Sequence, residues 1–237
     1  MIPAAALANA FERGALLAPP DRAASLLVAL DPTCDVASMP VGQCDALLFE
    51  FRRGLFGDAL DAVCRCPYCA EEVTLNLDLA AVQPAIADPP EVIEVRIGGY
   101  QLSCRLPRNS DLSELSRLGS DVGLQDIVGR CLTAATSDGG SPVAAHELPD
   151  DVALAVVEAM VDADPGSQVL LDISCPCGAR WTDQLDVRTV LWTELGVWVG
   201  ELLADVHRLA VGYRWSERDI LDLSPWRRAW YLQALGW

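Results

Sequence analysis

The amino-acid sequence predicts an α+β fold, in which a small antiparallel sheet is surrounded by helices and is followed by a long C-terminal helix and a terminal helical arm. Apolar residues recur every three or four positions in much of the first 60 residues and again over residues 189–214, as in amphipathic helices. Between these regions, short segments alternate apolar and polar residues, as half-buried strands do. Two tight groups of cysteines lie next to such strands.

The first 60 residues are expected to be helical. Arg22–Leu30 forms a short apolar helix that ends at Asp31-Pro32, because proline disfavours a helical conformation in the residue before it. A second helix, Gly42–Leu55, carries apolar residues at helical spacing and ends before Gly57. The period then changes, and residues 73–79 alternate as a half-buried strand does.

A hairpin is predicted after a linker at Pro84–Pro90. Its strands are Val92–Ile97 and Tyr100–Leu106, and the dipeptide Gly98-Gly99 between them favours a tight turn. Three helices follow, at Leu112–Leu118, Leu124–Ala135 and Asp150–Val161.

The last part of the chain returns to strands and then to helices. Two strands, Gln168–Ile173 and Ala179–Val187, flank the second cysteine group. The longest helix, Thr189–Arg214, has one apolar stripe. Ser216 is placed to cap a short helical turn, and Ser224-Pro225 begins a last helix that runs through Leu235.

We expect a single discontinuous architecture. Residues 1–187 comprise a helical N-terminal region and a β unit, which residues 60–106 and 167–187 contribute with helices inserted between them. Residues 188–237 comprise the long helix and the arm, packed on the same unit. Because the two cysteine groups are so far apart in the chain, the residues between them cannot be cut into independent domains.

The cysteine groups have the spacing of a zinc ribbon. Cys66 and Cys69 form a CPxC pair, and Cys175 and Cys177 form a shorter CPC pair. Two such pairs at the turns between strands can surround Zn²⁺ with four thiolates at about 2.3 Å. We therefore predict a closed, structural zinc site that clips the two strand pairs together and makes the sheet zinc-ribbon-like.

The fourth ligand is left open by the sequence. The CPC pair is one residue short, so Cys64 is an alternative to Cys177. Buried or redox-active thiols without a metal are the alternative to the zinc site as a whole. The other cysteines stand alone among apolar residues, and we expect them to be small buried side chains: Cys34, Cys44, Cys104 and Cys131.

Charge and hydropathy exclude two classes of partner. The chain has 17 basic and 34 acidic residues, a formal net charge of −17, so it repels the phosphate backbone of nucleic acids. The longest apolar tract, around Val197–Leu203, is too short to cross a bilayer. The first 20 residues lack the basic start and apolar block of a secretory signal. We expect a cytoplasmic protein that binds neither nucleic acid nor membrane.

Enzymatic activity is not expected. The sequence holds no glycine-rich phosphate loop, no Gly-x-Ser-x-Gly elbow and no His-Glu-x-x-His motif. The two histidines, His146 and His207, lie far from the cysteine groups in the sequence. Two alternative functions each require a further feature. A zinc-ribbon regulatory or nucleic-acid-associated module needs a basic face near the cysteines, and a thiol redox enzyme needs an accessible cysteine of low pKa.

The C-terminal arm combines aromatic and arginine side chains, which are enriched at the hot spots of protein interfaces. The alternative to a docking surface is ordinary packing of the last helices on the long helix. The candidate partner-binding residues are Trp215, Trp226, Arg227, Arg228, Trp230 and Tyr231.

Segments spread over most of residues 20–235 share their order and spacing with one protein family. They are Met39–Leu48, Leu55–Gly57, Cys66–Cys69, Arg105–Pro107 with Asp111-Leu112, Cys175–Gly178 with Trp181, Leu191–Leu195, His207–Ala210, Tyr213–Glu217 and Arg227-Arg228. Together they resemble a family known from loci of contractile-tailed phages and phage-tail-like injection systems, related to the T4-type baseplate hub assembly chaperones. The resemblance implies a non-enzymatic assembly or structural protein that binds baseplate or hub components, and it gives no oligomeric state.

This chain departs from the family pattern in two places. Gln43-Cys44-Asp45 stands where the pattern has Arg-Asp, and the CPC group is shorter than the CPxCG of the pattern.

Overall fold

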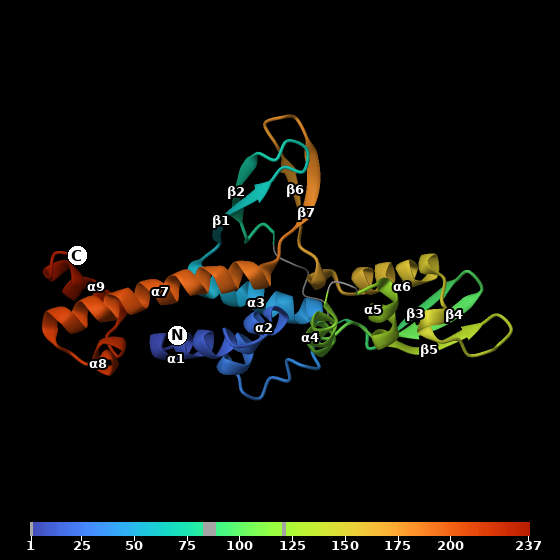
Figure 1. Ribbon diagram of the computed structural model, residues 1–237, viewed down its shortest axis with the longest axis horizontal. Coiled ribbons are helices and arrows are strands. Elements are labelled where there is room, and N and C mark those ends of the chain that lie inside the picture. Colours follow the sequence, from blue (N-terminus) through green and yellow to red (C-terminus); the bar gives the residue numbers. More distant parts are fainter. Residues whose placement is uncertain (1, 83–88, 120–121) are drawn as a thin grey trace. The chain divides into compact units, whose positions relative to one another are not determined.

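The computed structural model describes residues 2–82, 89–119 and 122–237 (Figure 1). They form two units, one of Met1–Cys34 with Arg188–Trp237 and one of Asp35–Val187. Most of the predicted linker, residues 84–88, lies outside the described residues. The mixture of helices and small antiparallel sheets confirms the α+β class.

The first unit is helical. Its helices are α1 (Ala4–Gly14), α2 (Pro19–Leu30), α7 (Val187–Tyr213), α8 (Glu217–Leu221) and α9 (Pro225–Ala234). The ring of Phe11 on α1 stacks on that of Trp192 on α7, with centroids 4.5 Å apart. The structure thus groups residues 1–34 with the long helix, whereas the sequence analysis grouped them with the residues up to 187. That the long helix packs on the β unit stays a prediction.

The C-terminal arm folds back on the end of α7. Leu209, Ile220 and Leu232 belong to a small buried cluster there. Both predicted N-caps are present, since Ser216 Oγ accepts a hydrogen bond from the Asp219 N–H at 3.2 Å and Ser224 Oγ accepts one from the Arg227 N–H at 3.3 Å. These caps fix where each short helix of the arm begins.

The second unit contains three small sheets and four α-helices among its described residues. In chain order its elements are α3 (Val41–Phe56), β1 (Ala59–Arg65), β2 (Glu72–Asp78), β3 (Ile93–Ile97), β4 (Tyr100–Cys104), α4 (Asn109–Arg117), α5 (Leu124–Cys131), β5 (Leu132–Ser137), η2 (Ala145–Glu147), α6 (Asp150–Ala163), η3 (Pro165–Ser167), β6 (Leu170–Ser174) and β7 (Arg180–Gln184).

The predicted hairpin is present as β3 and β4, with Gly98 and Gly99 both at positive φ (59° and 81°) in its turn. The prediction that it shares a sheet with the cysteine hairpins is wrong. It pairs instead with β5 in a separate three-stranded sheet of order β3-β4-β5. The reason is packing, because Leu102 of β4 and Ala135 of β5 are buried in one core cluster with residues of α5 and α6.

The predicted helix Leu124–Ala135 is wrong in its last four residues. Helix α5 ends at Cys131, and Leu132 already pairs with Cys104 across the sheet. The Ala134-Ala135 pair favours a helix by intrinsic propensity. The sheet prevails because residues 132–137 complete the hydrogen bonding of β4 and bury Ala135.

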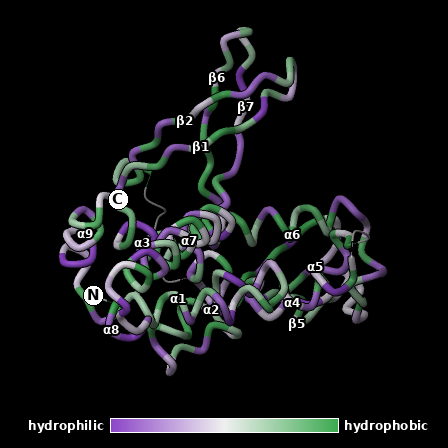
Figure 2. The backbone as a smooth tube through the Cα atoms, turned by 60° about the vertical axis from the view of Figure 1, so that its left-hand side comes forward, coloured by the Kyte–Doolittle hydropathy of each residue, from purple (hydrophilic) through white to green (hydrophobic). Residues whose placement is uncertain are grey.

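The two cysteine groups lie on two antiparallel hairpins, β1-β2 and β6-β7, which stand side by side in both views (Figures 1 and 2). Between them Val73 of β2 and Ile173 of β6 are buried, with Leu75, Leu171 and Trp181 packed against them. Strand β1, which the sequence analysis did not assign, pairs along its whole length with β2.

Helix α3 begins at an unusually close backbone contact. The carboxylate of Asp164, at the end of α6, accepts a hydrogen bond from the N–H of Gly42 at 2.8 Å, so a residue 122 positions away caps this helix. A β-carbon at Gly42 would overlap Asp164 Oδ1 and the backbone nitrogen of Ser167. One at Gly166 would lie 2.8 Å from the Gly42 oxygen. Both glycines are therefore needed for the contact.

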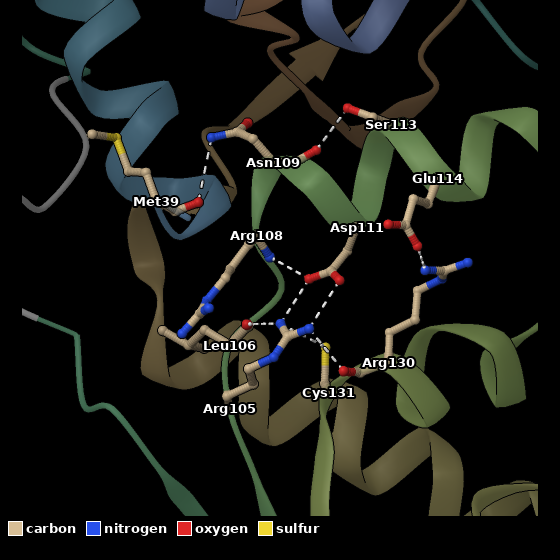
Figure 3. A network of polar contacts seen from close by, with 10 residues as sticks. All are labelled: Met39, Arg105, Leu106, Arg108, Asn109, Asp111, Ser113, Glu114, Arg130 and Cys131. Carbon is tan, nitrogen blue, oxygen red and sulfur yellow. Dashed lines mark hydrogen bonds and ion pairs between the residues drawn. The ribbon is translucent and has the colours of Figure 1, made fainter. Parts of the chain in front are cut away.

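A second polar contact holds α4 and α5 to the three-stranded sheet (Figure 3). The guanidinium of Arg105 donates to both oxygens of Asp111, at 2.7 and 2.9 Å, and to the carbonyl oxygen of Arg130 at 2.8 Å. The N–H of Arg108 donates to Asp111 Oδ2 at 2.8 Å. Burial raises the pKa of Asp111, but hydrogen bonds from Arg105 and Arg108 outweigh it and hold that pKa below its usual range.

Replacing Gly42 by alanine is expected to lower the free energy of unfolding by about 2–3 kcal/mol, because the new methyl group overlaps backbone atoms that cannot move aside. Gly54→Ala, in the same helix and with no atom near its β-carbon position, is the control. It is expected to be neutral or to stabilise by up to about 1 kcal/mol. Urea unfolding measures the free energy of unfolding of both variants. Equal changes in the two variants would contradict the close contact at Gly42.

Replacing Asp111 by asparagine is expected to cost roughly 2–4 kcal/mol of stability at pH 7, because Asp111 is buried and the partly buried Arg105 guanidinium loses its charged partner. The control is Glu72→Gln, which removes an exposed pair with Arg65 and should cost less than about 1 kcal/mol.

The Asp111 effect should depend on pH. A carboxyl whose pKa is lowered by folding contributes stability that is present above its unfolded pKa of about 3.9 and is lost as the pH falls through the folded pKa. The difference between wild type and Asp111→Asn should therefore shrink below about pH 4. A constant difference down to pH 2 in urea unfolding would contradict the ion pair.

Candidate metal centre

Four cysteine sulfurs meet where the two hairpins end. The Sγ atoms of Cys66, Cys69, Cys175 and Cys177 all lie within 4.8 Å of one another. Cys66 Sγ is 3.9 Å from Cys177 Sγ, and Cys69 Sγ is 3.6 Å from Cys175 Sγ. A tetrahedron with zinc–sulfur bonds of about 2.3 Å has edges of about 3.8 Å. These two separations therefore fit a tetrahedral metal site, and they are too long for a disulfide.

Backbone hydrogen bonds shape each cysteine turn. In the first turn the N–H of Cys66 donates to the Glu71 oxygen and the N–H of Ala70 donates to the Cys66 oxygen, both at 2.9 Å. In the second turn the N–H of Gly178 donates to the Cys175 oxygen, also at 2.9 Å. Ala70 and Gly178 have positive φ values of 61° and 93°. Such left-handed residues turn the chain back into the second strand of each hairpin.

The thiols differ in how readily they ionise. Burial disfavours the Cys66 thiolate, but the N–H groups of Cys69 and Tyr68 and the neighbouring thiols outweigh it and lower the pKa of Cys66 to about 7. The N–H of Cys177 favours the Cys175 thiolate, but burial and the three other sulfurs outweigh it and raise the pKa of Cys175 to about 12. A dication between the four sulfurs would supply the charge that stabilises four thiolates together.

Cys64 does not join the group. Its side chain is partly buried, and its Sγ lies 3.8 Å from the Val73 oxygen. Within the described part of the chain, neither histidine and no carboxylate is grouped with the four sulfurs. The donor set is thus all thiolate, which suits zinc or another thiophilic metal and leaves no water-bearing position of the kind that catalytic zinc sites keep.

The predicted aromatic and arginine patch is divided by the structure. Trp226 and Trp230 lie one turn apart on α9 and are 74% and 53% exposed. Arg227 between them is also exposed. The other three candidates belong to the interior of the arm, since Trp215 and Tyr231 pack against its buried cluster and Arg228 is buried.

One interaction near the α3 start was missed by sequence reasoning. By its sequence the segment Asp164-Pro165-Gly166 indicates only the end of a helix, but Asp164 caps α3 and Gly166 contacts Gly42. A lone Asp-Pro-Gly gives no signal for a partner 122 residues away.

Substituting single cysteines tests whether Cys177 or Cys64 is the fourth metal ligand. Cys177→Ser should reduce the metal content well below one ion per chain, because the site loses a thiolate donor. Cys64→Ser is the matched control and should keep one ion per chain, because Cys64 lies outside the group. Native mass spectrometry of both purified variants measures this. Metal loss in Cys64→Ser with retention in Cys177→Ser would contradict the site.

Comparison with known proteins places the chain in a family. A family model described as "T4 bacteriophage base plate protein" matches residues 27–186. This range covers more than half of the chain and includes both cysteine hairpins and the Arg105–Asp111 contact. No curated protein and no solved structure matches the chain. No helix among the described residues is long and apolar enough to cross a membrane. On the extent of the family match, the chain belongs to the T4 bacteriophage base plate protein family.

Proposed function

We propose that this protein is a non-enzymatic assembly or structural component of a contractile phage tail or a phage-tail-like injection system. It acts by binding baseplate or hub proteins, and a structural zinc ion holds its two cysteine hairpins together. Membership of the base plate family is the observation that carries the proposal. The residue pattern that resembles the hub assembly chaperones supports a role in assembling the hub.

Zinc is proposed as the metal because the donors are four thiolates with tetrahedral spacing. Bound there, zinc would supply a redox-inert cross-link between segments that are 106 residues apart in the chain. Closing so long a loop couples metal binding to folding. A structural rather than catalytic role follows from the closed donor set.

The proposed partner surface is the exposed face of α9, defined by Trp226, Arg227 and Trp230. Large aromatic side chains and arginine contribute most to interface hot spots. Trp226 and Trp230 are mostly exposed, although the Trp230 ring also contacts that of Tyr231 edge to face. Helix α9 carries two arginines and no acidic residue, although the whole chain has a formal charge of −17. This face therefore suits a baseplate or hub protein with an acidic and apolar docking surface.

The nucleic-acid-associated alternative is not favoured. The exposed side chains beside the cysteines include Glu71, Glu72 and Asp183 against Arg65 and Arg180, so the hairpins present no basic face.

A co-purification experiment tests the proposal. The tagged protein is expressed together with the baseplate and hub proteins of its own locus, and we expect at least one of them to be retained. Trp226→Ala with Trp230→Ala should weaken that binding at least roughly tenfold, because hot-spot tryptophans each contribute about 2 kcal/mol or more. Leu16→Ala, at a side chain that is 88% exposed outside α9, is the control and should leave binding unchanged. Retention of no baseplate or hub protein would contradict the proposed function.

A further inference from the structure

The second unit contains an apolar cavity with one unusual polar group in its wall. The cavity has a volume of about 430 Å³, within the range of roughly 300–1,000 Å³ for small-ligand pockets. Helices α4, α5 and α6 supply most of its wall, with side chains that include Leu112, Leu115, Ile127, Val157 and Met160. It is separate from the cysteine group and contains none of the four ligands.

Asp164 lines this cavity and is only 5% exposed. Its Oδ2 accepts the hydrogen bond from the Gly42 N–H that caps α3. Among the described residues, no group donates a hydrogen bond to its Oδ1. Burial raises the pKa of Asp164, and the single Gly42 donor lowers it less. An oxygen of this carboxylate that has no partner in the described part of the chain can accept a hydrogen bond from a donor that enters the cavity.

The other carboxylate in the cavity wall, that of Asp111, differs from Asp164 in its hydrogen-bond partners. Asp111 has both oxygens occupied by the Arg105 guanidinium and a further hydrogen bond from the Arg108 N–H. Asp164 is therefore the acidic group at which a ligand could add a hydrogen bond. Apolar walls around one such acceptor require a ligand with an aliphatic body and a donor at its end.

We propose that this cavity binds the lysine side chain of a partner protein, with the ammonium group on Asp164 and the methylene stem against Leu115 and Met160. Two observations favour lysine, and a third indicates its source. The carboxylate and the net charge of −17 favour a cation. The single unpaired oxygen suits a compact ammonium better than the five donors of a guanidinium. This chain itself has no lysine, so the side chain comes from another protein.

The chemistry of the site can be tested without any partner. The chain has three methionines, Met1, Met39 and Met160, and of these Met160 lines the cavity. In protein labelled with ¹³C on the methionine methyl groups, titration with hexylamine should shift the Met160 signal in a saturable way and leave the Met39 signal in place. Asp164→Asn should weaken the binding roughly tenfold, since it removes a charged hydrogen bond while an amide oxygen can still accept from Gly42.

Hexanol on the wild-type protein is the matched comparison, and it does not depend on whether the variant folds. It has the same apolar chain without the charge, so it should bind at least roughly tenfold more weakly than hexylamine. Equal binding of the two probes, or no shift of the Met160 signal with hexylamine, would overturn the ammonium site.

The claim that a partner protein supplies the lysine rests on the proposed function. It is tested on the complex that co-purifies with the tagged protein. Among side-chain amines, an amine-acetylating reagent modifies only the partner's lysines, because this chain has none. It also modifies the amino terminus of each chain. One partner lysine should be protected in the complex and lose its protection with Asp164→Asn. If a baseplate or hub protein is retained but no lysine depends on Asp164, the inference fails and the proposed function stands. If no baseplate or hub protein is retained, the proposed function fails. The hexylamine titration then decides by itself whether the cavity binds an ammonium group.

Discussion

The contact between two pairs of cysteines is the constraint on which the cysteine hairpins depend. Each hairpin has only two strands, and an isolated two-stranded hairpin is marginally stable at best. The small core between them, around Val73 and Ile173, exists only while the hairpins stay together. The sulfurs of Cys69 and Cys175, 106 residues apart in the chain, meet at 3.6 Å. A metal ion at this point would fix both turns and keep that core closed.

Two other long-range polar contacts organise the rest of the second unit. Asp164 joins the end of α6 to the start of α3, and Arg105 with Asp111 joins the three-stranded sheet to α4 and α5. Arg105–Pro107 and Asp111 also belong to the family-like pattern, and their spacing lets one bidentate ion pair close the loop. The proposed metal clip and lysine site belong to this unit, whereas the proposed α9 surface belongs to the other. The metal clip and the α9 surface can therefore be perturbed separately.

Local signals in the sequence were enough for much of this structure. Gly98-Gly99 predicts the turn of the β3-β4 hairpin, and Ser216 and Ser224 predict two caps. The cysteine spacing predicts that the two cysteine groups converge, but it left the fourth sulfur open between Cys64 and Cys177. Non-local choices were not predictable. Residues 132–135 were predicted to continue a helix, and they form a strand because β4 offers a partner. The capping of α3 by Asp164, and the burial of Arg228 beside the exposed Trp226, depend on contacts that no local pattern encodes.

Hydrogen exchange with and without a metal chelator tests the central claim most directly. If a metal holds the cysteine hairpins together, its removal should abolish amide protection in β1-β2 and β6-β7 at the same time. The β3-β4-β5 sheet should keep its protection, because its core of Leu102, Val128 and Val152 contains no metal ligand. Unchanged protection in both cysteine hairpins after the metal is removed, or no metal in the purified protein with both hairpins protected, would contradict the account.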